Sequence, residues 1–153
     1  MSEPKKEYEV FTQSWVQAWA DELRSSEAYR LAAIKWEGAL MVEMEADPDY
    51  GIDAERAVFL DLWHGDCRSG RLPIDGDQDN AEFIIRGPAA AWKRVLDGDL
   101  EPIFGIMSGK LKLTRGSMTA LMPFVGAAKE LVAAAVRTGG YFPNSNSNEG
   151  ENS

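Results

Sequence analysis

The feature of this chain that most constrains its fold is a two-residue alternation of apolar and polar side chains in several short segments. In one of these segments Leu40, Val42 and Met44 lie at alternate positions. A period of two predicts a strand that turns one face toward a core. The segments that show it are residues 39–45, 57–64, 81–86 and 110–114, and more weakly residues 66–73.

The connections between most of these segments have the composition of turns. Residues 46–51 and 75–80 are rich in Asp, Gly and other turn-forming residues, and Gly65 separates two strands that we expect to pair as a hairpin. Clustered strands with short connections are typical of an antiparallel sheet, whereas βαβ units alternate strands with helices. The pattern therefore predicts an α+β fold with helices on one face of the sheet.

Helical periodicity precedes the strands. Phe11, Trp15, Trp19 and Leu23 recur at every fourth position, which predicts an amphipathic helix over residues 8–24. A second helix is predicted at about residues 27–35, with a serine at position 25 or 26 as its N-cap.

Helical spacing returns at residues 88–108. Pro88 suits the first position of one helix, because its missing N–H has no partner there anyway. We expect Asp99 to be the N-cap of the next helix, which Gly109 ends.

Residues 116–128 contain no charged side chain. Because Pro123 cannot sit comfortably inside a helix, we expect a helical turn at residues 117–122 and a new helix from near Pro123 to about Arg137. A surface helix shows a polar face, and this stretch has almost none. Two interpretations follow: a helix buried in the core, or a lid over an apolar cavity.

Length and charge restrict the function classes. A chain of 153 residues predicts one domain, which we place at residues 8–139, between a flexible N-terminus (1–7) and a disordered tail (140–153). No window has the ~18 consecutive apolar residues of a membrane span, so we expect a cytoplasmic protein without stable membrane insertion. The net charge of −9 argues against nucleic acid as a partner.

The chain has one histidine, His64, and one cysteine, Cys67. A disulfide within the chain is therefore excluded, as is a metal site built from several His and Cys side chains. We expect no metal and no cofactor. A catalytic mechanism would have to use His64, with Asp66 or Cys67 beside it in the same hairpin.

Residues 96–113, followed by GSMTAL, resemble the C-terminal half of the sterol carrier protein 2 (SCP2) domain. The pattern Met-x-Gly-Lys-Leu-Lys, which leads from a helix into a strand, is present here at residues 107–112. Residues 58–67 and 81–98 are similar to further strands and a helix of that family. The resemblance implies a five-stranded, mostly antiparallel sheet, helices on one face, and an apolar tunnel that holds a lipid; it implies no catalytic residues.

The first hypothesis is therefore non-catalytic binding of a fatty acid, a fatty acyl group or another lipid. The apolar pattern places these residues in the tunnel wall: Trp92, Leu96, Ile103, Phe104, Met107, Leu111, Leu113, Met118, Leu121, Met122, Phe124 and Val125. A second hypothesis is a protein-interaction or regulatory module with a filled cavity, in which the apolar helix is core or a homodimer interface. A third is an enzyme that acts on a hydrophobic acyl substrate.

Overall fold

The computed structural model describes residues 8–144, which are built on a five-stranded sheet with the strand order β3-β2-β1-β4-β5. All neighbouring strands are antiparallel except β1 and β4, which are parallel. The strands are β1 (Ala39–Met44), β2 (Arg56–Trp63), β3 (Asp66–Arg71), β4 (Ala81–Gly87) and β5 (Lys112–Arg115). The predicted α+β class and mostly antiparallel sheet are confirmed.

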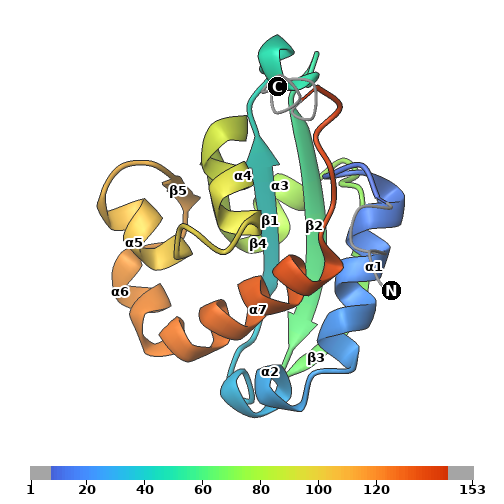
Figure 1. Ribbon diagram of the computed structural model, residues 1–153. Helices are drawn as coiled ribbons and strands as arrows, with labels where there is room; N and C mark the ends of the chain where they lie inside the picture. Colours follow the sequence, from blue (N-terminus) through green and yellow to red (C-terminus); the bar gives the residue numbers. More distant parts are fainter. Residues whose placement is uncertain (1–7, 145–153) are drawn as a thin grey trace.

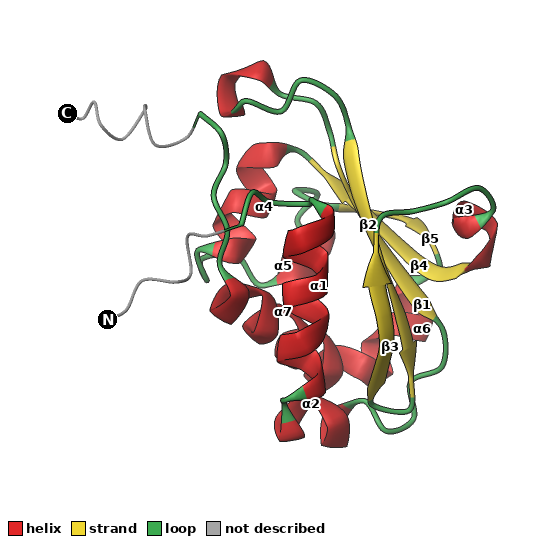
Figure 2. Cartoon of the chain, turned by 90° about the vertical axis from the view of Figure 1, so that its right-hand side faces the viewer, coloured by secondary structure: helices red, strands yellow, loops and turns green. Residues whose placement is uncertain are grey.

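Helices cover one face of this sheet. Figure 1 shows α7 crossing the sheet between α1 and the pair α4 and α5. Figure 2 shows the same helices, with α2, on one side of the strands and α3 on the other. The helices are α1 (Gln13–Arg24), α2 (Glu27–Ala32), α3 (Asp77–Asn80), α4 (Ala89–Leu96), α5 (Pro102–Met107), α6 (Met118–Leu121) and α7 (Val125–Thr138), with the 3-10 turns η2 (Pro48–Tyr50) and η3 (Met122–Phe124).

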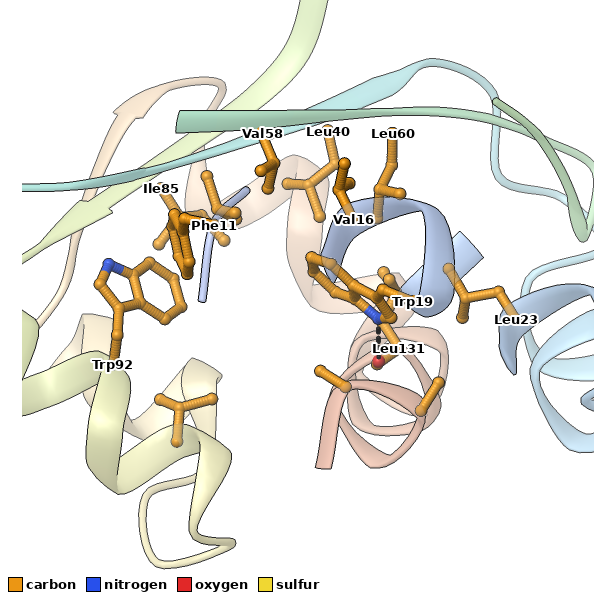
Figure 3. Packing of buried hydrophobic residues seen from close by; sticks show 14 of the residues in the cluster. Phe11, Val16, Trp19, Leu23, Leu40, Val58, Leu60, Ile85, Trp92 and Leu131 are labelled. Atoms are coloured by element: carbon orange, nitrogen blue, oxygen red, sulfur yellow. Dashed lines mark hydrogen bonds between the residues drawn. The ribbon is translucent and has the colours of Figure 1, made fainter. Parts of the chain in front are cut away.

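The main core lies between the sheet and these helices. The alternate apolar residues of the strands, among them Leu40, Val58 and Leu60, point toward α1 and α7 in Figure 3. Leu60 and Val58 are almost fully buried. The period of two in the sequence therefore marks the face that the helices cover.

A second, smaller cluster covers the opposite face of the sheet, where Met41, Phe59 and Ile84 are buried. The guanidinium carbon of Arg71 lies 4.3 Å from the centre of the Phe59 ring. Arg71 also forms an ion pair with the buried carboxylate of Asp77, at 2.8 Å. Both faces of the central strands are thus shielded, which explains why all six residues of β1 are buried.

The hairpin between β2 and β3 has a two-residue turn, His64-Gly65. Trp63 pairs with Asp66 across it, and both turn residues have positive φ, 52° and 90°. Two positive φ values are the signature of a type I′ turn, whose twist matches that of the paired strands. The hairpin expected around Gly65 is present.

The first helix begins at Gln13, five residues later than predicted. Thr12 is its N-cap, with a hydroxyl that accepts a hydrogen bond from the Trp15 N–H, and Phe11 has a φ of 58° that no helix tolerates. Before this helix, Glu9 forms a parallel bridge with Tyr141. The Tyr141 N–H donates to the Tyr8 carbonyl at 2.8 Å, and the Val10 N–H donates to the Tyr141 carbonyl at 3.1 Å.

Residues 140–144, which the sequence assigns to a disordered tail, pack against the domain. Phe142 is 3% exposed, and its ring lies 5.8 Å from that of Tyr50 in an edge-on contact. The two aromatic residues after Gly140 bury enough apolar surface to order this stub. The remainder of the predicted tail and the predicted flexible residues 1–7 lie outside the described residues.

Two predicted helix starts differ from the structure. Pro88 occupies the N-cap of α4, so the first helical residue is Ala89. The N-cap of α5 is Glu101 instead of Asp99, and its carboxylate accepts hydrogen bonds from the N–H groups of Ile103 and Phe104. Asp99 pairs with Arg94 instead, at 3.1 Å.

The uncharged stretch at residues 116–128 follows β5 and forms α6, η3 and the start of α7. Residues Met118–Thr138 are long and apolar enough to cross a membrane by length and composition alone, with a mean hydropathy of 1.4. In this fold α7 is the C-terminal core helix, with Leu131, Ala134 and Ala135 buried against the rest of the domain. Within residues 116–128 themselves only Leu121 and Ala127 are buried, so the stretch as a whole is not the fully buried helix that one interpretation expected.

Candidate functional site

An apolar pocket lies between the sheet and α1, α4, α5 and α7. Its volume is about 50 Å³, and every side chain that lines it within residues 8–144 is aliphatic or aromatic. The lining residues are Phe11, Trp15, Trp19, Trp36, Leu40, Val42, Ile85, Trp92, Val95, Leu96, Pro102, Ile103, Leu121, Ala128, Leu131, Val132 and Ala135. A site of this composition has no group for acid–base or nucleophilic chemistry and suits an apolar molecule.

The sheet forms one wall of the pocket. Leu40, Val42 and Ile85 lie at alternate positions on β1 and β4, so the strand periodicity turns all three toward the helices. Figure 3 shows Leu40 and Ile85 on this wall, with Phe11 and Trp92 in front of Ile85. The parallel pairing of β1 with β4 brings these side chains together.

Buried tryptophans form much of the opposite wall, and each donates its indole N–H to a backbone carbonyl. Trp19 donates to Leu131 at 3.0 Å, which links α1 to α7 (Figure 3). Trp92 donates to Glu43 at 2.9 Å and so ties α4 to β1. Because these polar groups are satisfied in the protein, the rings present only carbon to the pocket.

The other two lining tryptophans follow the same rule. Trp15 donates to the carbonyl of Gly139 at 2.8 Å, and Trp36 to that of Gly38 at 2.7 Å. The Phe11 ring stacks on Trp15, with centroids 5.0 Å apart and planes 14° from parallel. These contacts orient the aromatic rings of this wall.

Four of the residues predicted for the tunnel wall line the pocket: Trp92, Leu96, Ile103 and Leu121. They come from three separate helices, α4, α5 and α6. The helical spacing in the sequence placed them on buried faces, and α7 brings those faces together.

The other eight predicted residues lie elsewhere. Leu111 is almost fully buried but packs between Gly87 and Gly105, outside the pocket. Partly buried positions against the core are taken by Leu113, Met118, Phe124 and Val125. Phe104, Met107 and Met122 are 58%, 68% and 46% exposed.

Sequence reasoning missed the contribution of the N-terminal part of the chain. Phe11, Trp15, Trp19 and Trp36 line the pocket, although the prediction confined the wall to residues 92–125. The sequence does indicate that three of these residues are buried, because Phe11, Trp15 and Trp19 belong to the apolar face that recurs at every fourth position in the first predicted helix. What this pattern does not reveal is that α1 packs beside α7.

The pocket is small for a lipid. Sites that enclose drug-sized ligands commonly measure about 300–1,000 Å³, against about 50 Å³ here. A long acyl chain therefore requires side chains or a helix to move. The continuous tunnel that the resemblance implies stays an expectation, and the structure shows a small apolar pocket at the expected place.

Of the hairpin residues considered for catalysis, the Cys67 thiol is poorly suited to it. The Nε2 atom of His64 lies 2.6 Å from a carboxylate oxygen of Glu37, and the imidazole stacks on Trp63. Cys67 is buried, and burial raises the pKa of its thiol to about 11, in spite of the nearby Arg24 guanidinium, which lowers it. A thiol with that pKa is almost entirely protonated at neutral pH and is a weak nucleophile.

Comparisons with known proteins agree with this fold. The model of the SCP-2 sterol transfer family matches residues 20–129, which is most of the chain. This chain belongs to the SCP-2 sterol transfer family. Members of the family bind lipids and are generally non-catalytic, and the resemblance carried by residues 107–112 is confirmed.

Two solved SCP2-like structures are similar over nearly their whole length. A crystal structure of sterol carrier protein 2 is 43% identical, with a TM-score of 0.76, over 84% of this chain and 98% of that one. A conserved hypothetical protein of Thermus thermophilus, described as possibly a sterol carrier protein, is 40% identical, with a TM-score of 0.79, over 95% of this chain and 100% of that one.

A more distant structure shows the shared fold alone. Sterol carrier protein 2 of Yarrowia lipolytica, in its apo form, is 12% identical over 80% of this chain and 87% of that one, with a TM-score of 0.54. A search of curated proteins gave no match.

Proposed function

We propose that this protein binds a fatty acid or another single-chain lipid, without catalysis, in the space between α7 and the sheet. The observation that carries the proposal is the wholly apolar lining of the pocket, where even the tryptophan N–H groups are bonded to the protein itself. Each methylene transferred from water to such a lining contributes about 0.8 kcal/mol. Eight methylenes give roughly 6 kcal/mol before ordering costs.

Because the pocket measures only about 50 Å³, the proposal requires that part of the protein moves when a lipid binds. α6 and η3 join β5 to α7 in two short turns, and Met122 in η3 is 46% exposed. A shift of α7 away from the sheet would widen the pocket along Leu121, Ala128 and Val132, which line it from one side. The apolar stretch at residues 116–128 then acts as the lid considered from the sequence.

In this proposal the protein is a cytoplasmic carrier without enzymatic activity, and it requires no cofactor or metal. It binds no nucleic acid and does not insert stably into a membrane. The net charge of −9 supports the exclusion of nucleic acid, since phosphate binding needs a basic face. The weak nucleophilicity expected of Cys67 supports the exclusion of catalysis.

Two neighbouring residues provide a matched test. Leu121 is 2% exposed and lines the pocket, whereas Met122 next to it is 46% exposed and does not. We expect Leu121→Trp to weaken the binding of a fluorescent fatty acid at least tenfold, because the larger side chain occupies the ligand space. Met122→Trp should leave that binding unchanged.

Native mass spectrometry of protein purified from cells is the complementary measurement, and we expect a bound lipid mass. The melting temperature of both variants reports whether they fold. Equal fatty acid affinity in a folded Leu121→Trp variant and in the wild type would contradict the proposal.

The small volume of the pocket also favours a second candidate function, a protein-interaction module that has kept the fold with its cavity filled. In that case α7 is only a core helix or the interface of a homodimer. Purified protein then carries no lipid mass, and Leu121→Trp changes only stability or oligomeric state.

A further inference from the structure

Phe11 enters the apolar pocket from a short turn before α1. Of the described residues that line the pocket, all except Phe11 and Trp36 belong to a helix or a strand. The φ of Phe11 is 58°, in the left-handed region that a large side chain rarely adopts. Such a conformation costs free energy and persists only where the surrounding structure holds it. Because strained residues of this kind cluster at ligand sites, the Phe11 ring is a candidate for a functional role.

Several bonds fix the turn that carries Phe11. The Thr12 hydroxyl donates to the carbonyl of Glu9 at 2.7 Å and closes the turn. Arg56 on β2 anchors the turn to the sheet, because its guanidinium donates to the Val10 carbonyl at 3.0 Å and pairs with the Glu9 carboxylate at 2.7 Å. Val10 itself is fully buried. The backbone on both sides of Phe11 is therefore held in place.

Packed rings and backbone surround the Phe11 ring. It stacks on the Trp15 indole at a centroid distance of 5.0 Å and lies 5.7 Å from the Trp92 ring, tilted by 55°. Figure 3 shows the ring next to Trp92 and Ile85. Trp15 in turn packs so closely against Gly140 that a side chain at position 140 would collide with its indole. All three rings are at most 5% exposed, so this end of the pocket is closed.

The exposed side of the pocket lies at α6. Leu121 lines the pocket, while Met122, the next residue in the chain, is 46% exposed. Figure 1 shows α6 on the left of the molecule and α1 on the right. The α6 side is also where the lid at residues 116–128 is proposed to open. A lipid that enters beneath this lid meets Phe11 at the far end of its path.

We propose that Phe11 sets the length of the acyl chain that this protein accepts. The inference rests on the proposed function, since it requires a lipid in this pocket. The lining within residues 8–144 offers no group to receive a carboxylate, so the head group stays at the exposed side, near the lid. The methyl end then points toward Phe11, whose ring stops longer chains.

The size of the ring determines how much chain it excludes. The pocket measures about 50 Å³ with the Phe11 ring in place. An apolar cavity of about 150 Å³ takes up benzene, a molecule of the same size as this ring. Removing the ring therefore opens room for several more methylenes, and each methylene admitted strengthens binding about fourfold.

The test is competition of saturated fatty acids, from octanoic to stearic acid, against a fluorescent fatty acid. In the wild type we expect the affinity to rise with chain length and then to level off. In Phe11→Ala the levelling should move to longer chains. A fatty acid that exceeds the wild-type limit by two methylenes should bind this variant about fifteenfold more tightly than it binds the wild type. Chains below the limit should bind both proteins equally.

Phe59 offers a matched control. Its exposed fraction is 5%, against 3% for Phe11, but it lies on the opposite face of the sheet and does not line the pocket. Phe59→Ala removes the same ring and should leave the chain-length limit unchanged. If the melting temperature shows that an alanine variant does not fold, Phe11→Leu and Phe59→Leu make the same comparison with a smaller loss of volume. The limit should then move by a shorter step in Phe11→Leu alone.

Two outcomes would overturn the inference. One is an unchanged chain-length limit in the folded Phe11 variant, with all chains bound equally or all weakened by the same factor, which is the result of a purely structural role. The other is an equal shift of the limit in the Phe59 variant. Failure of the proposed function gives a different result, because no fatty acid then displaces the probe from the wild type, and the inference falls with it.

Discussion

Cys67 shows at the scale of one residue how burial decides chemistry. It is 4% exposed on β3, and its sulfur donates only a weak hydrogen bond to the Ser69 carbonyl, at 3.6 Å. The guanidinium of Arg24 bonds to the backbone carbonyl of Cys67 and leaves the thiol itself unpaired with a base. The same residue at an exposed, basic site would be reactive.

We therefore expect iodoacetamide to modify Cys67 very slowly in the folded protein. A rise of the thiol pKa from 9.0 to about 11 lowers the thiolate fraction at pH 8 about a hundredfold, and burial limits access further. The modification rate is measured by mass spectrometry, with the chain in urea as the control. Rapid modification of the folded protein would revive the catalytic hypothesis.

The segment between β3 and β4 shows how one element depends on a single carboxylate. Asp77, at the start of α3, accepts hydrogen bonds from two nitrogens of Arg71, at 2.8 and 3.2 Å, and from the Ile74 N–H at 2.6 Å. The Arg71 side chain then lies over the Phe59 ring. The connection is thereby fixed over the outer face of the sheet.

These bonds lower the pKa of Asp77, chiefly through the hydrogen bonds from Arg71. A carboxyl group with a depressed pKa in the folded state stabilises the fold above its unfolded pKa of about 3.9, and this contribution is lost as the pH falls through the folded pKa. We expect Asp77→Asn to lower the free energy of unfolding at pH 7 by about 1–3 kcal/mol.

The difference between Asp77→Asn and the wild type should begin to shrink as the pH falls below about 4, because the carboxyl of the unfolded chain then takes up a proton. It should be largely lost once the pH is below the lowered pKa of Asp77 in the folded protein. Urea denaturation at several pH values measures this. Asp79→Asn is the control, because Asp79 belongs to the same short helix and its exposed side chain forms no ion pair within residues 8–144. Equal effects of the two variants would contradict the role given to Asp77.

At the scale of the whole molecule, the pocket joins elements that are far apart in the sequence. The indole of Trp19 on α1 bonds to Leu131 on α7, and Trp92 on α4 bonds to Glu43 on β1. α7 therefore closes the pocket by packing against α1, α4 and α5 at once. A ligand in this space would add contacts to all of these elements.

We expect a bound fatty acid to raise the melting temperature of the protein. A ligand that binds only the folded state at 100 times its Kd adds about 2.7 kcal/mol to the free energy of unfolding. Differential scanning fluorimetry with increasing fatty acid measures the shift, which should be several degrees for the wild type and for Met122→Trp. A shift of the same size in Leu121→Trp would place the ligand outside the pocket.

The sequence by itself determined the strands and most helices, because burial on one face imposes a period of two or of about 3.6 on neighbouring residues. The alternation at Leu40 and Val42 and the four-residue stripe of Trp15 and Trp19 both mark buried faces correctly. Helix starts are less well determined, as Glu101 shows, since several polar residues in one segment are able to serve as an N-cap.

Only the tertiary structure decided which buried faces meet. The parallel pairing of β1 with β4 and the packing of α1 beside α7 depend on contacts between segments distant in the chain, and local periodicity carries no information about them. For this reason Ile103 and Leu121, among the residues predicted for the tunnel wall, line the pocket, whereas Phe104 and Met107 are exposed. Trp19 also lines the pocket, although the sequence did not predict it. The sequence shows directly that a side chain is apolar, but which cavity or surface that side chain faces depends on how distant segments pack together.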